Sequence, residues 1–123
     1  MILIPERNSP PSGCARVYTH VYSRGELLHF EWDPEKSDRN LREREFDFAF
    51  ATLIFDGPRL ESLDSRQDYG EDRIKAIGLA QNIILTVIYT DRYRGDGDLI
   101  RRIISARKSS VAERREYENA AEL

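Results

Sequence analysis

Arginine and lysine side chains recur at strand-like positions in the second half of the chain. Arg73 and Lys75 alternate with apolar residues, so both cations are expected to project from one face of a strand. Arg92 ends the next strand-like segment, and Arg107 ends a third, where it has the parity of Ile103. If these segments pair as hairpins, several of the guanidinium groups can converge on one site.

Such a cluster would suit phosphate chemistry. The guanidinium group is planar, keeps its charge at all ordinary pH values and gives phosphate two parallel hydrogen bonds. Between Arg92 and Arg115, eight basic residues stand against three acidic ones. A charge run of this kind is also typical of a solvated surface, so the pattern by itself leaves a phosphate site and a plain surface open.

Other kinds of catalytic chemistry lack their motifs. The sequence has no cysteine and histidine spacing for zinc, no glycine-rich phosphate loop and no nucleophile elbow, so neither a metal nor a cofactor is expected. His29 precedes Phe30 in an alternating segment and is expected on the surface, with a role as a base as the alternative. The carboxylates from Asp64 to Asp72 are interleaved with arginines, which favours ion pairs and turn caps over a metal site.

Composition indicates one globular domain. The chain has 123 residues, of which 40% are hydrophobic and 33% charged, and no apolar run approaches the roughly 20 residues of a membrane-spanning helix. Pro5 interrupts the apolar start Met1–Ile4 before a secretion signal could form. The single cysteine, Cys14, fits a reducing cytoplasm. The net charge of −3 argues against a protein that clamps nucleic acid over its whole surface.

The chain is expected to divide into a flexible arm over residues 1–27 and a folded domain over residues 28–123. Glu6–Gly13 contains paired prolines and no apolar period, which is the composition of a flexible segment. Ala15–Tyr22 alternates with a period of two. This pattern leaves an extra edge strand and an ordered tail both open.

The folded domain should begin with a strand and two helices. Leu28–Trp32 alternates apolar and polar residues, as a half-buried strand does. Asp33-Pro34 supplies an N-cap and a first residue for a largely polar helix that ends near Arg44. Asp47 caps a second, strongly apolar helix, and Gly57-Pro58 ends it.

Four strands and a final helix should follow. Alternation and turn residues predict strands over residues 59–64, 72–79, 83–91 and 99–107, of which the third is apolar on both parities and therefore central. Ser110 and Glu113 form a capping box that opens a C-terminal helix. The expected fold is α+β, with a small antiparallel sheet packed with two N-terminal helices and one C-terminal helix. The residues expected in the core are Trp32, Phe48, Leu53, Phe55, Ile74, Ile77, Leu85, Val87, Ile103 and Ile104.

Short blocks of the sequence resemble the successive blocks of BrnT-type toxins, in the same order and spacing. These blocks are Phe30–Lys36, Asn40-Leu41, Phe48-Ala49, Glu71–Arg73, Ala76–Gly78, Val87–Arg92 and Arg102–Arg107. Glu113 and Tyr117 complete the pattern. No single block is specific to the family, but the joint occurrence of all the blocks is specific. The resemblance does not include the first 29 residues.

The resemblance implies a RelE-like ribonuclease that cleaves messenger RNA without a metal, through attack of a ribose 2′-hydroxyl on the neighbouring phosphate. It also implies growth arrest as the outcome and neutralisation by a ribbon-helix-helix antitoxin of the BrnA kind. The toxin would contact operator DNA only as part of a complex with this antitoxin. A toxin homodimer within a heterotetramer is compatible with it. The catalytic residues that it implies are Lys36, Arg73, Arg92 and Arg107. The substrate-binding residues are Trp32, Arg44, Lys75 and Arg102.

The sequence departs from the family after Arg42. Where the family usually carries Lys-His-Gly, this chain has Glu43-Arg44-Glu45, so the family's candidate acid/base imidazole is missing. Three accounts stay open: a ribonuclease that uses Lys36 and the arginines, a weakened toxin that still binds its antitoxin, and a scaffold that acts only on transcription. A non-enzymatic module whose arginines dock an acidic partner or DNA is a further alternative.

Overall fold

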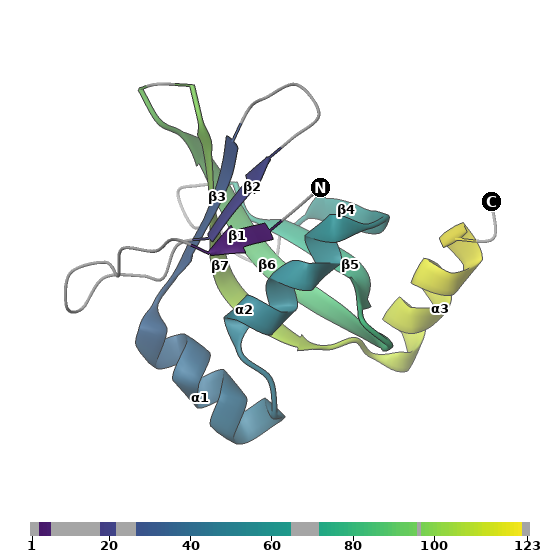
Figure 1. Ribbon diagram of the computed structural model, residues 1–123. Coiled ribbons are helices and arrows are strands. Elements are labelled where there is room, and N and C mark those ends of the chain that lie inside the picture. The colour runs from purple at the N-terminus through teal and green to yellow at the C-terminus, as the bar shows by residue number, and fades with distance from the viewer. Residues whose placement is uncertain (1–2, 6–17, 22–26, 65–71, 96, 122–123) are drawn as a thin grey trace.

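The computed structural model describes residues 3–5, 18–21, 27–64, 72–95 and 97–121, and Figure 1 shows their arrangement. The strands in these ranges are β1 (Leu3–Pro5), β2 (Tyr18–Val21), β3 (Leu27–Trp32), β4 (Arg59–Leu63), β5 (Ile74–Ala80), β6 (Ile83–Tyr93) and β7 (Leu99–Lys108). The helical segments are α1 (Pro34–Arg44), α2 (Phe48–Ala51), the 3₁₀ helix η1 (Thr52–Asp56) and α3 (Val111–Ala121). The fold is α+β, as predicted.

The sheet is mixed, so the expectation of an antiparallel sheet is wrong at one place. The strand order is β1-β2-β3-β7-β6-β5-β4, and β3 and β7 are the parallel pair among otherwise antiparallel neighbours. β4 to β7 pair in chain order, as predicted for hairpins. β3 instead reaches β7 through helices and three strands, and a long crossover connection permits a parallel pair. Alternation within each strand carries no information about this pairing of distant segments.

One face of the sheet holds the hydrophobic core, and α2 and η1 lie across it (Figure 1). Gly78 of β5 permits this close packing, because a Cβ atom there would lie 2.8 Å from the Cβ of Ile54 in η1. The predicted core residues that are buried are Trp32, Phe48, Phe55, Ile77, Leu85, Val87 and Ile103. The predicted core residues that are only partly buried are Leu53, Ile74 and Ile104.

Helix α1 begins and ends where the sequence predicts. The side chain of Asp33 accepts a hydrogen bond from the Glu35 N–H at 2.9 Å, and Pro34 is the first helical residue. At the other end, Glu45 adopts a left-handed conformation with φ of 72°, and its N–H donates to the Leu41 carbonyl at 3.1 Å. Glycine is the residue that fits this position without strain.

The second predicted helix is present but changes its pitch. Asp47 caps it by accepting a hydrogen bond from the Phe50 N–H at 2.9 Å. After four α-helical residues the chain continues as η1 to Asp56 and ends at Gly57. The capping and ending residues are therefore as predicted, whereas the tighter second half is not encoded in the apolar pattern.

Helix α3 is held to the sheet by polar contacts. The predicted capping box forms, since the Glu113 N–H donates to Ser110 Oγ at 3.2 Å and the Ser110 N–H donates to Glu113 Oε1 at 2.8 Å. The Tyr117 hydroxyl donates to the Pro58 carbonyl at 3.0 Å. Among the described side chains of α3, the buried one is that of Glu113. The helix is thus anchored through a carboxylate rather than through an apolar stripe.

The N-terminal residues that the structure describes extend the sheet. β2 pairs with β3, with Thr19 opposite His29, so the alternative of an extra strand in Ala15–Tyr22 is confirmed as Tyr18–Val21. The strand at this edge of the sheet is β1 rather than β2. The flexible arm expected over residues 1–27 falls mostly outside the described residues.

Candidate functional site

Strand register places most of the predicted cations on the sheet face opposite the core. Arg102 of β7 pairs with Thr90 of β6, and Arg92 lies two residues further along β6. Lys75 of β5 pairs with Ile88, two residues before Thr90. Side chains two residues apart on a strand, and side chains of paired residues, lie on the same face. We call this surface the cationic face, and it carries Lys75, Arg92, Arg102 and Arg107.

Arg107 reaches the cationic face because β7 contains a β-bulge. Consecutive residues of β6 pair with Ser105 and with Ile103, which leaves Ile104 as an extra residue in β7. A bulge shifts the alternation of a strand by one residue. The parity that grouped Arg107 with Ile103 is therefore wrong, since Ile103 lies in the core and Arg107 projects from the opposite face.

Three charged groups meet near the end of β7. Arg107 donates to the two carboxylate oxygens of Glu113 at 2.6 and 3.0 Å, and the Lys75 Nζ lies 2.8 Å from Glu113 Oε2. The hydrogen bond from Arg107, together with those from Lys75 and Ser110, holds the pKa of Glu113 well below its ordinary value despite burial. The carboxylate is therefore ionised and occupies the position where a bound anion would contact both cations.

A hollow of about 410 Å³ adjoins this cluster. Arg44 enters it from the end of α1, where its Nη1 donates to the Ala106 carbonyl at 2.8 Å and to Asn40 Oδ1 at 3.3 Å. Three predicted site residues, Arg44, Lys75 and Arg107, thus meet here. The residues lining the hollow are Arg44, Ser62, Leu63, Asp64, Lys75, Ile88, Ser105 and Arg107.

A second charged cluster lies further along the cationic face. Glu31 of β3 accepts hydrogen bonds from Arg92 Nη1 at 2.5 Å and from Arg102 Nη1 at 3.3 Å. Burial alone would raise the pKa of Glu31, but the hydrogen bonds and charges of the two arginines outweigh burial and lower it. The side chain of Arg92 is 56% exposed and that of Arg102 is 40% exposed. Both guanidinium groups can therefore contact a molecule on this face.

The other predicted site residues lie apart from the hollow. Arg73 directly precedes β5 and has the parity of Lys75, and its carbonyl continues the ladder by accepting from the Asp64 N–H at 2.7 Å. Alternation therefore assigns Arg73 to the cationic face. Lys36 is exposed in the first turn of α1. Trp32 is fully buried in the core, on the opposite side of the sheet.

His29 is buried, so its expected place on the surface is wrong. Its exposed fraction is 7%, and its Nε2 lies 3.1 Å from Asp98 Oδ2 at the base of the β6–β7 hairpin. Alternation correctly separated His29 from the core residues Phe30 and Leu28. The sequence pattern could not show that Asp98, 69 residues further along the chain, contacts this end of β3.

Sequence reasoning missed the carboxylates that organise the cations. The sequence marks Glu31 as a polar residue of an alternating strand and Glu113 as a helix cap, and both fall in the family pattern, but neither is predicted to pair with the cations. Arg101 was grouped with the charge run, yet it is buried in the core and donates to both Asp91 carboxylate oxygens at 2.8 and 2.9 Å. Its guanidinium also lies over the rings of Phe55 and Tyr89. Strand parity could have indicated this. Adjacent residues of a strand point to opposite faces, so Arg101 and Arg102 cannot both lie on the cationic face.

The described residues contain no group of three or more histidine, cysteine, aspartate or glutamate side chains arranged to hold a metal. Within the same ranges, every helix is too short or too polar to cross a bilayer. The profile of a protein family described as the ribonuclease toxin BrnT of type II toxin-antitoxin systems matches residues 32–113, well over half of the 123-residue chain. A search of curated proteins finds no match.

Proposed function

Because the chain belongs to the BrnT family of ribonuclease toxins of type II toxin-antitoxin systems, we propose that it cleaves RNA on the cationic face of its sheet. The observation that supports this most is the shared face of Lys75, Arg92, Arg102 and Arg107. The β-bulge in β7 places Arg107 on the same face as the other three cations, so the four charges form one row. An extended row of cations is what an RNA backbone needs, since phosphates supply most of the affinity.

The hollow is the proposed site of a phosphate next to the one that is cleaved. Arg107 can give such a phosphate two parallel hydrogen bonds, as it gives Glu113 now. Lys75 adds a second positive charge, and Arg44 reaches the same space from α1. A phosphate here must displace the carboxylate of Glu113, so RNA binding and the position of α3 are coupled.

Cleavage itself is proposed at the cluster of Glu31, Arg92 and Arg102. The ribose 2′-hydroxyl loses its proton to the Glu31 carboxylate, its oxygen bonds to phosphorus, and the bond from phosphorus to the 5′-oxygen breaks. The products are a 2′,3′-cyclic phosphate and a free 5′-hydroxyl, whose proton comes from Lys36 or water. Each arginine has five N–H donors, so Arg92 and Arg102 can hold Glu31 and stabilise the charged phosphorane together.

The altered Lys-His-Gly block fits this assignment. Arg44 stands at the family's histidine position and lines the hollow, but a guanidinium keeps its proton at any ordinary pH and cannot act as a base. A carboxylate on the cationic face supplies the missing proton acceptor. The substrate that we propose is messenger RNA in the cytoplasm, cleaved without a metal, with growth arrest as the result.

The proposed partner is a ribbon-helix-helix antitoxin of the BrnA kind, which would also carry the complex to operator DNA. A toxin homodimer within a heterotetramer is the assembly we propose for that complex. A second candidate function, an antitoxin-binding scaffold with weak turnover, is favoured by two observations. Arg44 cannot transfer a proton, and Glu113 already occupies Lys75 and Arg107.

The test is cleavage of a synthetic RNA by the purified chain in the presence of EDTA, with products identified by mass spectrometry. A 2′,3′-cyclic phosphate end is expected, and Arg92→Ala should reduce the rate by about 10²-fold or more. The matched control is Arg39→Ala, which removes an exposed arginine of α1. Equal rates for the two variants, or the absence of cleavage by the native chain, would favour the scaffold.

A further inference from the structure

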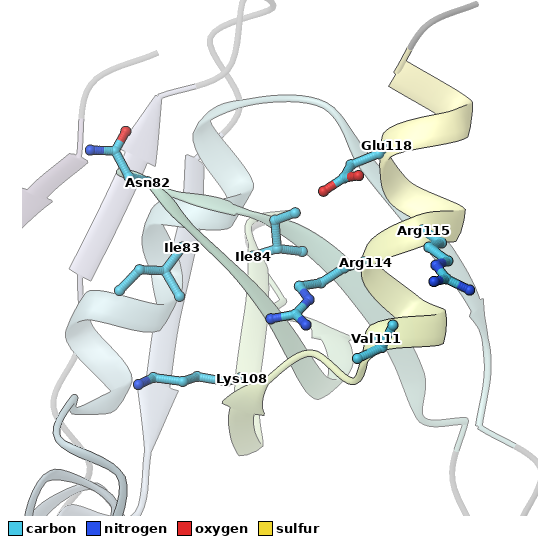
Figure 2. Close-up of a pocket in the computed structure, with 8 residues that line it drawn as sticks. All are labelled: Asn82, Ile83, Ile84, Lys108, Val111, Arg114, Arg115 and Glu118. Atoms are coloured by element: carbon cyan, nitrogen blue, oxygen red, sulfur yellow. The ribbon is translucent and has the colours of Figure 1, made fainter.

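A second hollow lies beside α3, and none of its lining residues belongs to the two charged clusters. It measures about 580 Å³ and opens between the β5–β6 turn, the end of β7 and α3 (Figure 2). We call its apolar lining residues, Ile83, Ile84 and Val111, the floor, of which Ile83 and Ile84 project from opposite sides of β6. We call its basic lining residues, Lys108, Arg114 and Arg115, the rim. We call this feature the α3 groove.

The α3 residues of this groove form one stripe of the helix. Val111, Arg114, Arg115 and Glu118 are spaced at i, i+3, i+4 and i+7, and such residues share a helix face. Figure 2 shows Arg114 and Glu118 extending from α3 towards Ile84. A different stripe, which contains Glu113 and Tyr117, contacts the rest of the protein. The groove stripe is therefore available to a partner.

The floor exposes apolar surface that the fold does not cover. Val111 is 54% exposed and Ile83 is 38% exposed. An apolar centre with a charged rim is the usual construction of a protein-binding surface. RNA is a poorer fit, because phosphates supply most of its affinity and gain nothing from the exposed apolar side chains of Val111 and Ile83.

The charges of the rim define the chemistry of the occupant. The lining contains three basic residues and one acidic residue, Glu118, so the complementary ligand is acidic. We propose that an acidic segment of the antitoxin, with at least one apolar anchor, docks in the α3 groove. This inference rests on the proposed function for the identity of the partner.

Docking there would also account for neutralisation. An occupant that contacts Ile83 and Lys108 on the sheet side and Arg114 on the helix side joins α3 to the sheet. Held in that position, α3 keeps Glu113 on Arg107 and Lys75. The bound antitoxin thus keeps a phosphate out of the first hollow without covering it.

The binding experiment uses the full chain and the antitoxin encoded beside it. The double substitution Lys108→Glu with Arg114→Glu should weaken antitoxin binding by about tenfold or more. The matched control, Arg39→Glu with Arg42→Glu, reverses two exposed charges of α1 and should leave the affinity unchanged. Val111→Ser tests the apolar floor separately, and thermal melts of all variants establish that they fold. Unchanged affinity in the groove variants, or an equal loss in the control, would overturn the proposal.

Two further readouts separate this proposal from the ribonuclease assignment. RNA binding by the free chain should be the same in groove variants and wild type, and a loss would identify the groove as an RNA site instead. Hydrogen exchange over residues 111–121 should slow when the antitoxin binds, whereas faster exchange would show that α3 is displaced and would contradict the clamp. If the native chain binds the antitoxin but does not cleave RNA, the ribonuclease proposal fails. The antitoxin affinities of the groove variants still test the docking proposal in that case.

Discussion

The carboxylate of Glu113 accepts hydrogen bonds from two guanidinium nitrogens of Arg107, at 2.6 and 3.0 Å. This bidentate geometry is the one that arginine also offers to phosphate. Glu113 belongs to α3, whereas Arg107 belongs to the sheet. The contact therefore links α3 to the sheet and occupies the guanidinium group that we propose for RNA binding.

Replacing Glu113 with glutamine should strengthen RNA binding. Arg107 and Lys75 would lose a competing charge, and a gain of about 1 kcal/mol, or roughly fivefold in affinity, is expected from a partly exposed ion pair. Fluorescence anisotropy with a labelled RNA measures this. Glu116→Gln, on the exposed side of α3, serves as the control. Unchanged affinity in the Glu113 variant would mean that phosphate does not compete for these cations.

The same substitution should lower stability in a pH-dependent way. The folded-state pKa of Glu113 is lowered from its ordinary value of 4.5, so its ionised form stabilises the native state above that pH. The loss should be on the order of 1–2 kcal/mol at pH 7, from the cap and the charge-assisted hydrogen bonds. As pH falls below 4.5, the difference between wild type and variant should shrink. Urea unfolding at pH 7 and pH 3 measures it, and a constant difference would refute the linkage.

Glu31→Gln should abolish turnover while RNA binding persists. Loss of a general base typically costs 10² to 10⁴-fold in rate, whereas Arg92 and Arg102 would remain to bind phosphate. Because the arginines lower the pKa of Glu31, the acid limb of the native rate profile should lie below pH 4.5, and it should vanish in the variant. Single-turnover cleavage across pH provides the readout. A variant that cleaves at the native rate would exclude Glu31 as the base.

Restoring the family's residues with Glu43→Lys and Arg44→His should raise the cleavage rate. The histidine would stand at the mouth of the first hollow, which Arg44 lines now, and it could exchange a proton near neutral pH. Growth inhibition in cells without the antitoxin should rise in parallel. Native and restored chains that cleave equally fast would show that Glu31 alone suffices for proton transfer.

Glu45→Gly should stabilise the protein. Glu45 is held at φ of 72°, a conformation that costs a side-chain-bearing residue roughly 1 kcal/mol and costs glycine almost nothing. The matched control is Glu43→Gly, inside α1, which should destabilise by about 1 kcal/mol. The midpoints of urea unfolding should therefore move in opposite directions. A parallel shift would show that the left-handed position carries no strain.

The sequence predicts local features of this fold well. Asp33, Asp47 and Ser110 cap helices as their side-chain chemistry dictates, and alternation identifies the strands and most of the core. The features that escaped prediction depend on contacts between distant segments. Parity failed for Arg107 because one extra residue at Ile104 inverts it, and His29 contacts Asp98, which lies far along the chain.

The candidate site was predictable as a set of cations but not as an arrangement. Arginine suits phosphate wherever it occurs, and residue type together with strand position and the family resemblance selects Arg92 and Arg107. The opposing carboxylates Glu31 and Glu113 were missed because an acidic residue near a basic cluster has many possible neighbours. Only the register of β3, β6 and β7 makes them partners of particular arginines.

The parallel pairing of β3 with β7 has a consequence for a chain that is still being synthesised. Glu31 and Arg102 are 71 residues apart in sequence, so a ribosome delivers β3 long before its neighbour exists. The proposed base then has neither arginine beside it, so under the proposed function a nascent chain of that length does not yet cleave RNA. β7 completes the cleavage cluster, and the α3 residues of the antitoxin groove follow it directly along the chain. Under the same proposal, RNA cleavage and antitoxin docking become possible in close succession, once β7 and α3 have been synthesised.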